Sequence, residues 1–384
     1  MRLLISAGGT GGGVYPALSV ATTAKSNWEL VTGNDNQLPL TTRSGQLLWV
    51  GSYGGMEADL VQRAGFPFRA IHGAGVHGVG WRLPLNALDL LRGLAEALGV
   101  VRAYQPDVVF VTGGFITAPV AVAAWLSRVP VLVYLPDIEP GLAVRLIGRL
   151  ARRIAVTVDD SRSFFAQRGQ AAKVLVTGYP TRPGLAAISR GDARAALGLE
   201  AERPVLLVTG GSRGARSINR AVFKALPDWL KDYQVVHLSG QLDWHEVEPA
   251  RAALPAELAA RYHAYPFLHE MGQALAAADL VVSRAGASAL GEYPLFGLPA
   301  ILVPYPYAWR YQKVNADYLA RRGAALRLND EDLALRLAPD VRALLDDPRR
   351  LAAMRQAARS AARPGAADQI AVELARLAGN ATRP

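Results

Sequence analysis

The sequence predicts an α/β protein made of two Rossmann-like domains, each built on a parallel sheet. Short apolar or β-branched runs alternate with amphipathic segments rich in Ala, Leu and Arg, which is typical of parallel strands covered by helices on both faces. The chain has 384 residues, whereas one ordinary domain has roughly 100–200. We therefore expect two domains that face each other across a cleft.

The predicted strands fall into two series separated by a proline-, glycine- and charge-rich stretch at 181–203. They are 3–6, 47–50, 108–111, 131–134, 154–156 and 174–176, then 205–208, 235–238, 280–282 and 300–303. We place an N-terminal domain at 1–182 and a C-terminal domain at 183–360. Segment 361–384 is expected to form a helix that packs back on the N-terminal domain, and the polar segment 22–44 a long loop.

Composition excludes several classes of site. The chain has no cysteine, so disulfides, thiolate nucleophiles and cysteine-based metal centres are excluded. Its histidines lack metal-ligand spacing, and we interpret His237, at the end of an apolar strand, as structural. The acidic run 330–332 precedes an apolar segment, so a helix cap is favoured over a metal-binding pair. We predict no metal and no cofactor.

The charge balance indicates an anionic partner. Lys and Arg number 42 against 32 Asp and Glu, a net charge of +10, which attracts polyanions, anionic lipid or phosphorylated substrates. Nucleic acid is not expected, because basic and aromatic residues do not alternate.

Two segments bear on membrane binding. Segment 79–94 best fits a core-facing amphipathic helix; the alternative is a helix lying on an anionic membrane, supported by the arginines within 145–153. The apolar stretch 118–136 is interrupted by prolines and Arg128, so we predict a helix and then a strand instead of a membrane span.

Glycine clusters follow predicted strands at 8–13, 113–114 and 210–214. At a strand-to-helix turn, glycines let backbone N–H groups approach an anion. One cluster is equally consistent with a tight turn that binds nothing, but three favour a phosphate-bearing ligand. Neither the P-loop Lys-Ser/Thr pair nor the dinucleotide G-x-G-x-x-G spacing is present, so ATP hydrolysis and hydride transfer are not indicated.

A series of short motifs extends these clusters along the chain. They are Gly8-Gly9-Thr10-Gly11-Gly12, Gly113-Gly114-Phe115, Thr177-Gly178-Tyr179-Pro180-Thr181-Arg182, Gly210-Gly211-Ser212, Ser283-Arg284-Ala285-Gly286-Ala287 through Glu292, and Gln312 with Asn315-Ala316. In this order they resemble the MurG family, bacterial peripheral-membrane enzymes that transfer N-acetylglucosamine (GlcNAc) from UDP-GlcNAc to lipid I, giving lipid II for peptidoglycan. The resemblance runs from residue 2 to about residue 330.

The resemblance implies a GT-B glycosyltransferase fold and inverting transfer to the C4 hydroxyl of the N-acetylmuramic acid (MurNAc) of undecaprenyl-linked lipid I. It also implies that no metal is obligatory. It places the protein at the cytoplasmic face of the cell membrane, bound peripherally to anionic lipid.

The resemblance also implies roles for single residues. Ser212 would contact the donor diphosphate, Glu292 the ribose hydroxyls and Gln312 the sugar hydroxyls. A carboxylate can accept from both ribose hydroxyls, and a carboxamide can both donate and accept. The remaining donor-side residues are Thr10, Gly11, Gly12, Asp137, Arg182, Leu268, Ala287, Ser288, Ala289, Leu290 and Gly291, and the acceptor-side residues are Gly9, Gly13, Gly113, Gly114 and Phe115.

The chain departs from the MurG pattern on the acceptor side. Gly13 stands where the family usually has His, and Tyr134-Leu135-Pro136-Asp137 replaces His-Glu-Gln-Asn. Because a carboxylate at a strand end can accept the proton of an attacking hydroxyl, we interpret Asp137 as the base. The alternatives are a GT-B enzyme for another lipid such as diacylglycerol, a non-catalytic protein that binds a lipid precursor, and a UDP-GlcNAc epimerase.

Overall fold

The computed structural model describes residues 1–8, 11–33, 45–73, 83–167, 169–211, 214–307 and 310–379. These residues form two compact units. The first consists of Met1–Pro183 and Gly365–Pro384, and the second of Gly184–Pro364. Each unit contains one parallel sheet, so the prediction of two Rossmann-like α/β domains is confirmed.

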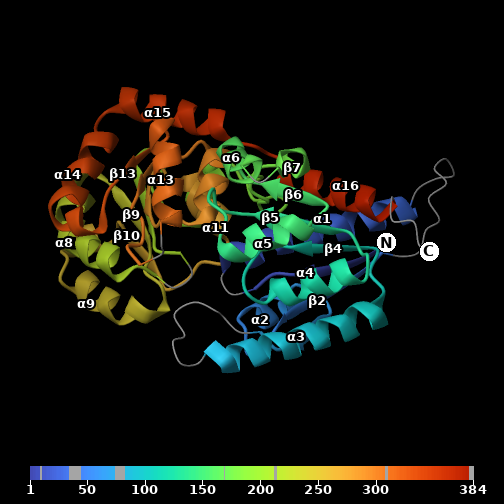
Figure 1. Cartoon of the computed structure of the whole chain (residues 1–384). Coiled ribbons are helices and arrows are strands. Elements are labelled where there is room, and N and C mark those ends of the chain that lie inside the picture. Colours follow the sequence, from blue (N-terminus) through green and yellow to red (C-terminus); the bar gives the residue numbers. More distant parts are fainter. Residues whose placement is uncertain are drawn as a thin grey trace. The chain divides into compact units, whose positions relative to one another are not determined.

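The first unit has a seven-stranded sheet in the order β3-β2-β1-β4-β5-β6-β7. The strands are β1 (Arg2–Ser6), β2 (Gln46–Ser52), β3 (Phe68–Ile71), β4 (Val108–Val111), β5 (Val131–Leu135), β6 (Arg153–Val156) and β7 (Val174–Val176). The helices are α1 (Gly11–Gly33), α2 (Glu57–Arg63), α3 (Leu83–Tyr104), α4 (Thr117–Leu126), α5 (Leu142–Leu150), α6 (Arg162–Ala166) and α16 (Ala366–Gly379). Side chains of α1 and α16 share one core with the sheet, and those of α3, α4 and α5 share the other. Figure 1 labels these five helices in the first unit.

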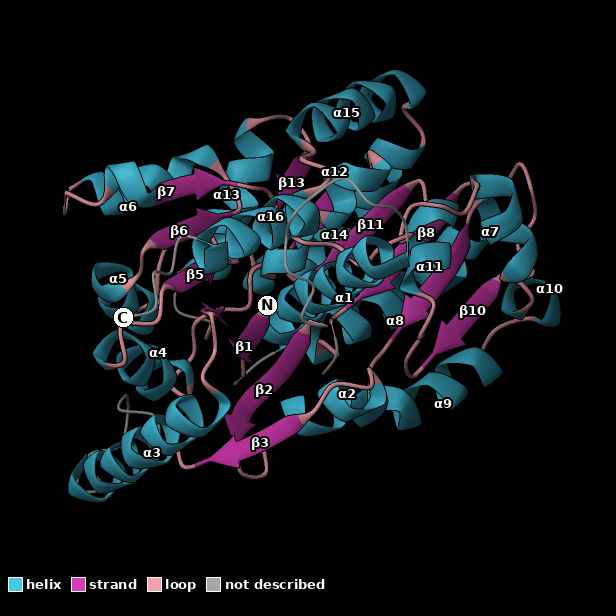
Figure 2. Cartoon of the chain, turned by 90° about the vertical axis from the view of Figure 1, so that its right-hand side faces the viewer, coloured by secondary structure: helices cyan, strands magenta, loops and turns pink. Residues whose placement is uncertain are grey.

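The second unit has a six-stranded sheet in the order β10-β9-β8-β11-β12-β13. The strands are β8 (Val205–Thr209), β9 (Gln234–Leu238), β10 (Tyr262–Tyr265), β11 (Leu280–Ser283), β12 (Ala300–Leu302) and β13 (Ala325–Arg327). The helices are α7 (Arg190–Ala196), α8 (Arg216–Asp232), α9 (Val247–Ala252), α10 (Ala256–Ala259), α11 (Met271–Ala277), α12 (Glu292–Phe296), α13 (Tyr311–Arg321), α14 (Leu333–Leu345) and α15 (Pro348–Ala361). Figure 2 shows these helices in cyan beside the magenta strands.

In each sheet the strand order reverses at one point. This point lies between β1 and β4 in the first sheet and between β8 and β11 in the second. In open α/β sheets, ligands bind outside the carboxyl ends of the strands at such a switch point. The glycine clusters at 8–13 and 113–114 follow β1 and β4, and the cluster at 210–214 follows β8. The strand order thus places all of them where this fold binds ligands.

The predicted loop at 22–44 is wrong over residues 22–33, which belong to α1. The helix continues because Ala17, Val20, Ala21 and Ala24 form a buried stripe at helical spacing. Trp28 extends that stripe by one more turn and packs against the same core. Residues 34–44 lie outside the described part of the chain.

Three strands were not predicted from the sequence: β3, β10 and β13. Each lies at an edge of its sheet, where only one side has a neighbouring strand. Each contains a charged or ionisable residue, namely Arg69, His263 and Arg327. Short edge strands of this kind lack the continuous apolar run that marks a buried strand.

The apolar stretch 118–136 forms most of α4 followed by β5, as predicted. Within the part of the chain that the structure describes, no helix is both long enough and apolar enough to cross a bilayer.

Candidate active site

The loop after β8 turns sharply into α8. Gly211 and Gly214 have φ angles of +80° and +76°, which favour glycine, and a Cβ atom on Gly214 would collide with the backbone oxygen of Ser239. Gly214, two residues before α8, therefore has no room for a side chain, and the helix dipole at the first turn of α8 favours an anion. Ser212, predicted to contact the diphosphate, lies outside the described residues.

The loop after β11 carries the next group of predicted donor residues. Ala287–Leu290 form a 3-10 turn, in which only Ser288 is partly exposed, and Gly291 is buried. Glu292, half-buried, begins α12. The Tyr293 hydroxyl donates to Ser283 Oγ at 2.8 Å, and burial raises the pKa of Tyr293 well above its usual range. This buried bond fixes α12 against the end of β11.

Gln312 lies in the first turn of α13, after β12. Its Oε1 accepts the backbone N–H of Tyr305 at 2.8 Å. Because the carbonyl end of the carboxamide is engaged in this way, the NH₂ group is the end that can donate to a ligand hydroxyl. The bond also ties Tyr305, which follows β12, to α13.

The structure brings several predicted donor residues to the carboxyl ends of the strands of the second sheet. The loops with Gly210, Glu292 and Gln312 follow β8, β11 and β12, which are consecutive neighbours. Leu268 is half-buried in the loop after β10, two strands from β8. Arg182 is exposed after β7 and belongs to the first unit.

In the first unit, the turn of acceptor-side glycines at Gly113-Gly114 lies against the backbone of Gly8. Gly113 and Gly114 have φ angles of +88° and +95°, and a Cβ atom on Gly114 would lie 2.8 Å from the oxygen of Gly8. Phe115 follows with a partly exposed ring. Gly11 and Gly12 begin α1, whereas Gly9 and Thr10 lie outside the described residues.

Gly13 is packed tightly against Thr112. A Cβ atom on Gly13 would lie 3.0 Å from Thr112 Oγ1, and Thr112 is itself buried. A larger residue such as the histidine typical of the MurG pattern would need Thr112 to move. The structure thus gives a steric reason for glycine at this position.

Asp137 is half-buried two residues after β5. Its loop is held by Thr157 Oγ1, which donates to the oxygen of Pro136 at 2.8 Å, and by Ser161 Oγ, which donates to the oxygen of Ile138 at 2.9 Å. Tyr134 is fully buried and hydrogen-bonded to Thr157 at 2.7 Å. Burial raises the pKa of Tyr134, so Asp137 is the group in 134–137 that suits proton transfer.

Glu57 was not identified from the sequence. It begins α2, it is fully buried, and its Oε1 accepts from the backbone N–H and the hydroxyl of Ser52 at 2.8 and 2.6 Å. A Cβ atom on Gly8 would lie 2.8 Å from the same oxygen. Glu57 thus packs against the backbone that follows β1, a role that a first-turn glutamate in a sequence does not reveal.

His237 is structural, as predicted. Its ring is buried between Tyr262 Oη, 2.8 Å from Nδ1, and Asn219 Oδ1, 2.9 Å from Nε2. The Asn219 amide donates to Ser239 and Asp243, so Asn219 Oδ1 accepts from Nε2–H and Tyr262 donates to Nδ1. Burial lowers the pKa of His237 to about 3. The neutral imidazole therefore fixes Asn219 in the first turns of α8.

Asp330, within the acidic run 330–332, is engaged in a side-chain network. It accepts from Ser217 Oγ at 2.8 Å and forms an ion pair with Arg284. Asp332 occupies the N-cap position of α14, but its Oδ2 accepts from Asn329 Nδ2 at 3.0 Å instead of from the helix backbone. Among the described residues, no cluster of three or more His, Asp or Glu side chains could hold a metal ion.

Comparison with protein families accounts for both units. Residues 3–156 match the glycosyltransferase family 28 N-terminal domain, and residues 205–370 match the glycosyltransferase family 28 C-terminal domain. A relative from Roseiflexus sp. (strain RS-1) is 39% identical, with 98% of this chain and 95% of the relative aligned. That relative is named UDP-N-acetylglucosamine–N-acetylmuramyl-(pentapeptide) pyrophosphoryl-undecaprenol N-acetylglucosamine transferase.

Comparison with solved structures confirms the predicted GT-B glycosyltransferase fold. The crystal structure of MurG from Acinetobacter baumannii aligns with a TM-score of 0.72 and 24% identity, over 98% of this chain and 99% of that one. UDP-GlcNAc 2-epimerase from Neisseria meningitidis, solved with UDP-GlcNAc bound, aligns with a TM-score of 0.67 and 12% identity, over 98% and 100%. Because the fold is shared by transferases and an epimerase, the fold alone does not choose between their activities.

Proposed function

Since this chain belongs to glycosyltransferase family 28, among the UDP-N-acetylglucosamine–N-acetylmuramyl-(pentapeptide) pyrophosphoryl-undecaprenol N-acetylglucosamine transferases, we propose that it transfers GlcNAc from UDP-GlcNAc to lipid I. The acceptor atom is the C4 oxygen of MurNAc, and the product is lipid II. The observation that carries the proposal is the sequence identity with a named transferase along almost the whole chain. An epimerase shares the fold at far lower identity.

The second unit supplies the donor site. The glycine loop before α8 receives the diphosphate of UDP-GlcNAc, because backbone N–H groups and the helix dipole favour an anion there. Glu292 accepts from the ribose hydroxyls, and the Gln312 amide donates to a sugar hydroxyl. Ser212 and the backbone of Leu268 complete the contacts with the nucleotide. The glycine loop before α8 also stabilises the negative charge that develops on UDP as UDP leaves.

The transfer step forms one bond and breaks another. The C4 oxygen of MurNAc attacks the anomeric carbon of GlcNAc from the face opposite the diphosphate, and the bond between that carbon and the phosphate oxygen breaks. The electron pair leaves with UDP, and the configuration inverts. The hydroxyl proton passes to Asp137, which is the only ionisable carboxylate in the replaced 134–137 motif. Typical general bases contribute about 10²–10⁴-fold to a rate.

The acceptor's lipid tail requires contact with a membrane, and the first unit carries a suitable surface. Exposed apolar side chains lie on three packed helices: Leu91 on α3, Trp125 and Leu126 on α4, and Leu142 and Leu146 on α5. Figure 2 shows these helices together. Exposed Arg128, Arg149 and Arg152 lie at or beside the ends of α4 and α5 and suit anionic lipid phosphates. We call these exposed apolar and arginine side chains the membrane surface of the protein. This surface binds peripherally to the cytoplasmic face of the cell membrane.

The membrane surface agrees only in part with the segment singled out in the sequence. In α3, Leu94 packs against the core, as in the favoured interpretation, but Leu91 is 63% exposed. Residues 79–82 and the side chains of 83–88 lie outside the described part of the chain. Among the side chains of α3, α4 and α5 that the structure describes, the exposed large apolar residues are Leu91 on α3, Trp125 and Leu126 on α4, and Leu142 and Leu146 on α5.

The proposal is tested with purified protein, labelled UDP-GlcNAc and three acceptor conditions: lipid I, diacylglycerol and no acceptor. We expect UDP and a labelled glycolipid to form in equal amounts when lipid I is the acceptor, and neither to form in the other two conditions. Release of UDP with diacylglycerol would indicate a different lipid acceptor. Conversion of the donor without any lipid would indicate an epimerase, and binding of the donor without UDP release a non-catalytic protein.

A further inference from the structure

Arg284 lies at the centre of the loops that follow four neighbouring strands of the second unit. It comes directly after β11, and β8, β11, β12 and β13 are consecutive in the sheet. Its side chain is 11% exposed, so little of the guanidinium is available to solvent. A largely buried guanidinium is costly unless hydrogen-bond acceptors or a counter-ion pair with it.

The acceptors of Arg284 come from the segments that follow each of the other three strands, namely the start of α8 after β8 and the loops after β12 and β13. Nη2 donates to Ser217 Oγ in α8 at 2.8 Å, and Nη1 donates to the oxygens of Val303 and Pro304 after β12 at 3.3 and 3.4 Å. Nη1 also pairs with Asp330 after β13. The Tyr305 ring lies 5.3 Å from the guanidinium carbon, within range of a cation–π contact.

Ser217 closes this cluster. Its hydroxyl accepts from Arg284 and donates to Asp330 Oδ1 at 2.8 Å. The side chains of Ser217, Arg284 and Asp330 therefore form a closed ring of hydrogen bonds, which we call the Arg284 clamp. Charge-assisted bonds of this kind are about twice as strong as neutral ones.

We propose that the Arg284 clamp positions the donor site. It holds the loops bearing Gly210, Glu292 and Gln312 in the relative positions in which all three contact one nucleotide sugar. This inference rests on the proposed donor site of the second unit. In this proposal Arg284 acts through these loops and not on the diphosphate, because both Nη1 and Nη2 already donate to protein oxygens. Asp330 is the counter-ion of the clamp and not a metal ligand.

Neutralising Asp330 separates the clamp from a direct phosphate contact. In Asp330→Asn the side chain keeps its shape but loses its charge. A clamp then loosens and UDP binds more weakly, whereas an arginine that bound phosphate directly would be freed and would bind UDP equally well or more tightly. Glu331→Gln is the matched control, since Glu331 is exposed in the same acidic run.

The experiment measures UDP binding by calorimetry and, separately, the KM for UDP-GlcNAc and kcat in the full-length protein. We expect Asp330→Asn and Arg284→Met to raise the Kd for UDP and the KM about 10-fold or more, and Arg284→Lys to recover only part of the affinity because an ammonium group cannot reach all four acceptors. Glu331→Gln should leave both constants within about twofold. Addition of EDTA should change neither the wild type nor the variants.

The outcomes distinguish this inference from the proposed function. If the wild type binds no UDP, the proposed donor site itself is wrong. If the wild type binds UDP and Asp330→Asn binds it equally well or more tightly while remaining folded by circular dichroism, the clamp is overturned. A variant that proves unfolded is replaced by Ser217→Ala, which removes the two hydrogen bonds of Ser217 in the ring and leaves the ion pair of Arg284 with Asp330, and is expected to raise the Kd about threefold to tenfold.

Discussion

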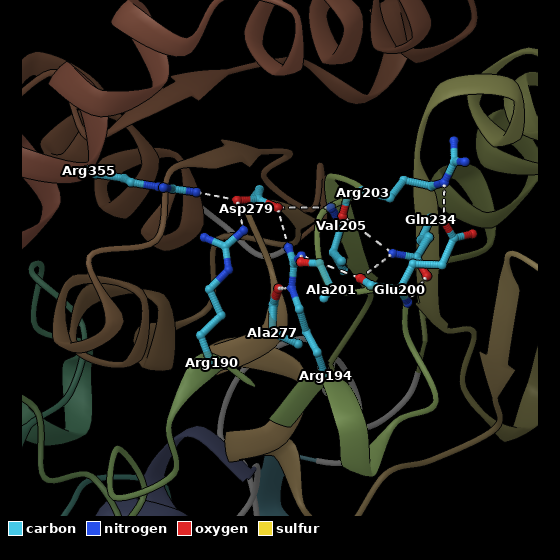
Figure 3. A network of polar contacts seen from close by, with 10 residues as sticks. All are labelled: Arg190, Arg194, Glu200, Ala201, Arg203, Val205, Gln234, Ala277, Asp279 and Arg355. Carbon is cyan, nitrogen blue, oxygen red and sulfur yellow. Dashed lines mark hydrogen bonds and ion pairs between the residues drawn. The ribbon is translucent and has the colours of Figure 1, made fainter. Parts of the chain in front are cut away.

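Asp279 and Arg194 form an ion pair in the second unit, with Arg194 Nη2 2.8 Å from Asp279 Oδ2 (Figure 3). The same carboxylate oxygen accepts the backbone N–H of Val205, the first residue of β8, at 2.9 Å. Arg190 and Arg355 both pair with the other oxygen. One carboxylate at the start of β11 thus joins α7, β8 and α15, at the end of the sheet opposite to the glycine loop.

Arg194 is predicted to stabilise the second unit far more than Arg190. The side chain of Arg194 is 4% exposed and that of Arg190 44%. Arg194→Ala leaves the buried carboxylate with fewer partners and should lower the free energy of unfolding by about 3 kcal/mol. Arg190→Ala should lower it by about 1 kcal/mol or less. Urea denaturation compares the two, and equal losses would show that the buried pair has no special importance.

His237 predicts a loss of stability in acid. Its pKa is lowered to about 3 in the folded protein by burial, against about 6.5 in an unfolded chain. Below pH 6.5 the unfolded state therefore binds the proton more readily, and stability falls as the pH falls towards 3, by up to about 1.4 kcal/mol per pH unit.

Urea denaturation between pH 7 and pH 4 measures this slope. His237→Gln should lower stability at pH 7 and also reduce the slope, since the titrating group is gone. His245→Gln, at an exposed position, is the control and should keep the wild-type slope. A slope unchanged in His237→Gln would contradict the assignment.

Gly13→Ala is predicted to destabilise the first unit because the new Cβ atom would lie 3.0 Å from Thr112 Oγ1. The sign should reverse in a Thr112→Ala background. With the hydroxyl removed, alanine in α1 has the advantage of its helix propensity, about 1 kcal/mol over glycine. Thermal unfolding of the four proteins in this cycle checks the prediction, and strictly additive effects would show that the two side chains do not meet.

Asp137→Asn is predicted to lower kcat about 100-fold or more and to leave the Kd for UDP unchanged, because a base acts in the transfer step and not in nucleotide binding. The acidic limb of the pH–rate profile should also disappear. Asp59→Asn, an exposed carboxylate on α2, serves as control. A near-normal kcat with an unaltered pH profile would show that another group accepts the proton.

The membrane surface is predicted to bind anionic vesicles through both apolar and charged residues. Trp125→Ser combined with Leu126→Ser should weaken binding about tenfold or more, since each side chain is 52% exposed and available to lipid. Raising the salt concentration should weaken the wild type as well, by screening the arginines. Leu335→Ser, at an 82% exposed leucine in the second unit, should bind like the wild type in vesicle flotation.

The sequence sufficed for those parts of the fold that depend on local pattern. Strands such as β4 and β8 were predicted because every residue in them is apolar or β-branched and buried. The turn at Gly113-Gly114 was predicted from the glycines, and its positive φ angles show why they are needed. Trp28 shows the limit: its place on a helix became clear only from the core that it packs against.

The Arg284 clamp could not be predicted, because its members are far apart in the sequence. Ser217, Arg284 and Asp330 meet only because β8, β11 and β13 lie within one stretch of the same sheet. A sequence pattern does not contain strand order, so Asp330 was interpreted locally, as a helix cap. Glu57 was missed for a similar reason, since Gly8, against which its carboxylate packs, follows β1 and is far from Glu57 in the sequence.

The most direct test of the transfer chemistry is mass spectrometry and NMR of the lipid formed from lipid I and ¹³C-labelled UDP-GlcNAc. We predict one added GlcNAc residue, joined by a β linkage to the C4 oxygen of MurNAc, with the pyrophosphate and the lipid unchanged. Lipid I recovered without added sugar, although the protein binds UDP-GlcNAc, would contradict the assignment of this chain as a transferase.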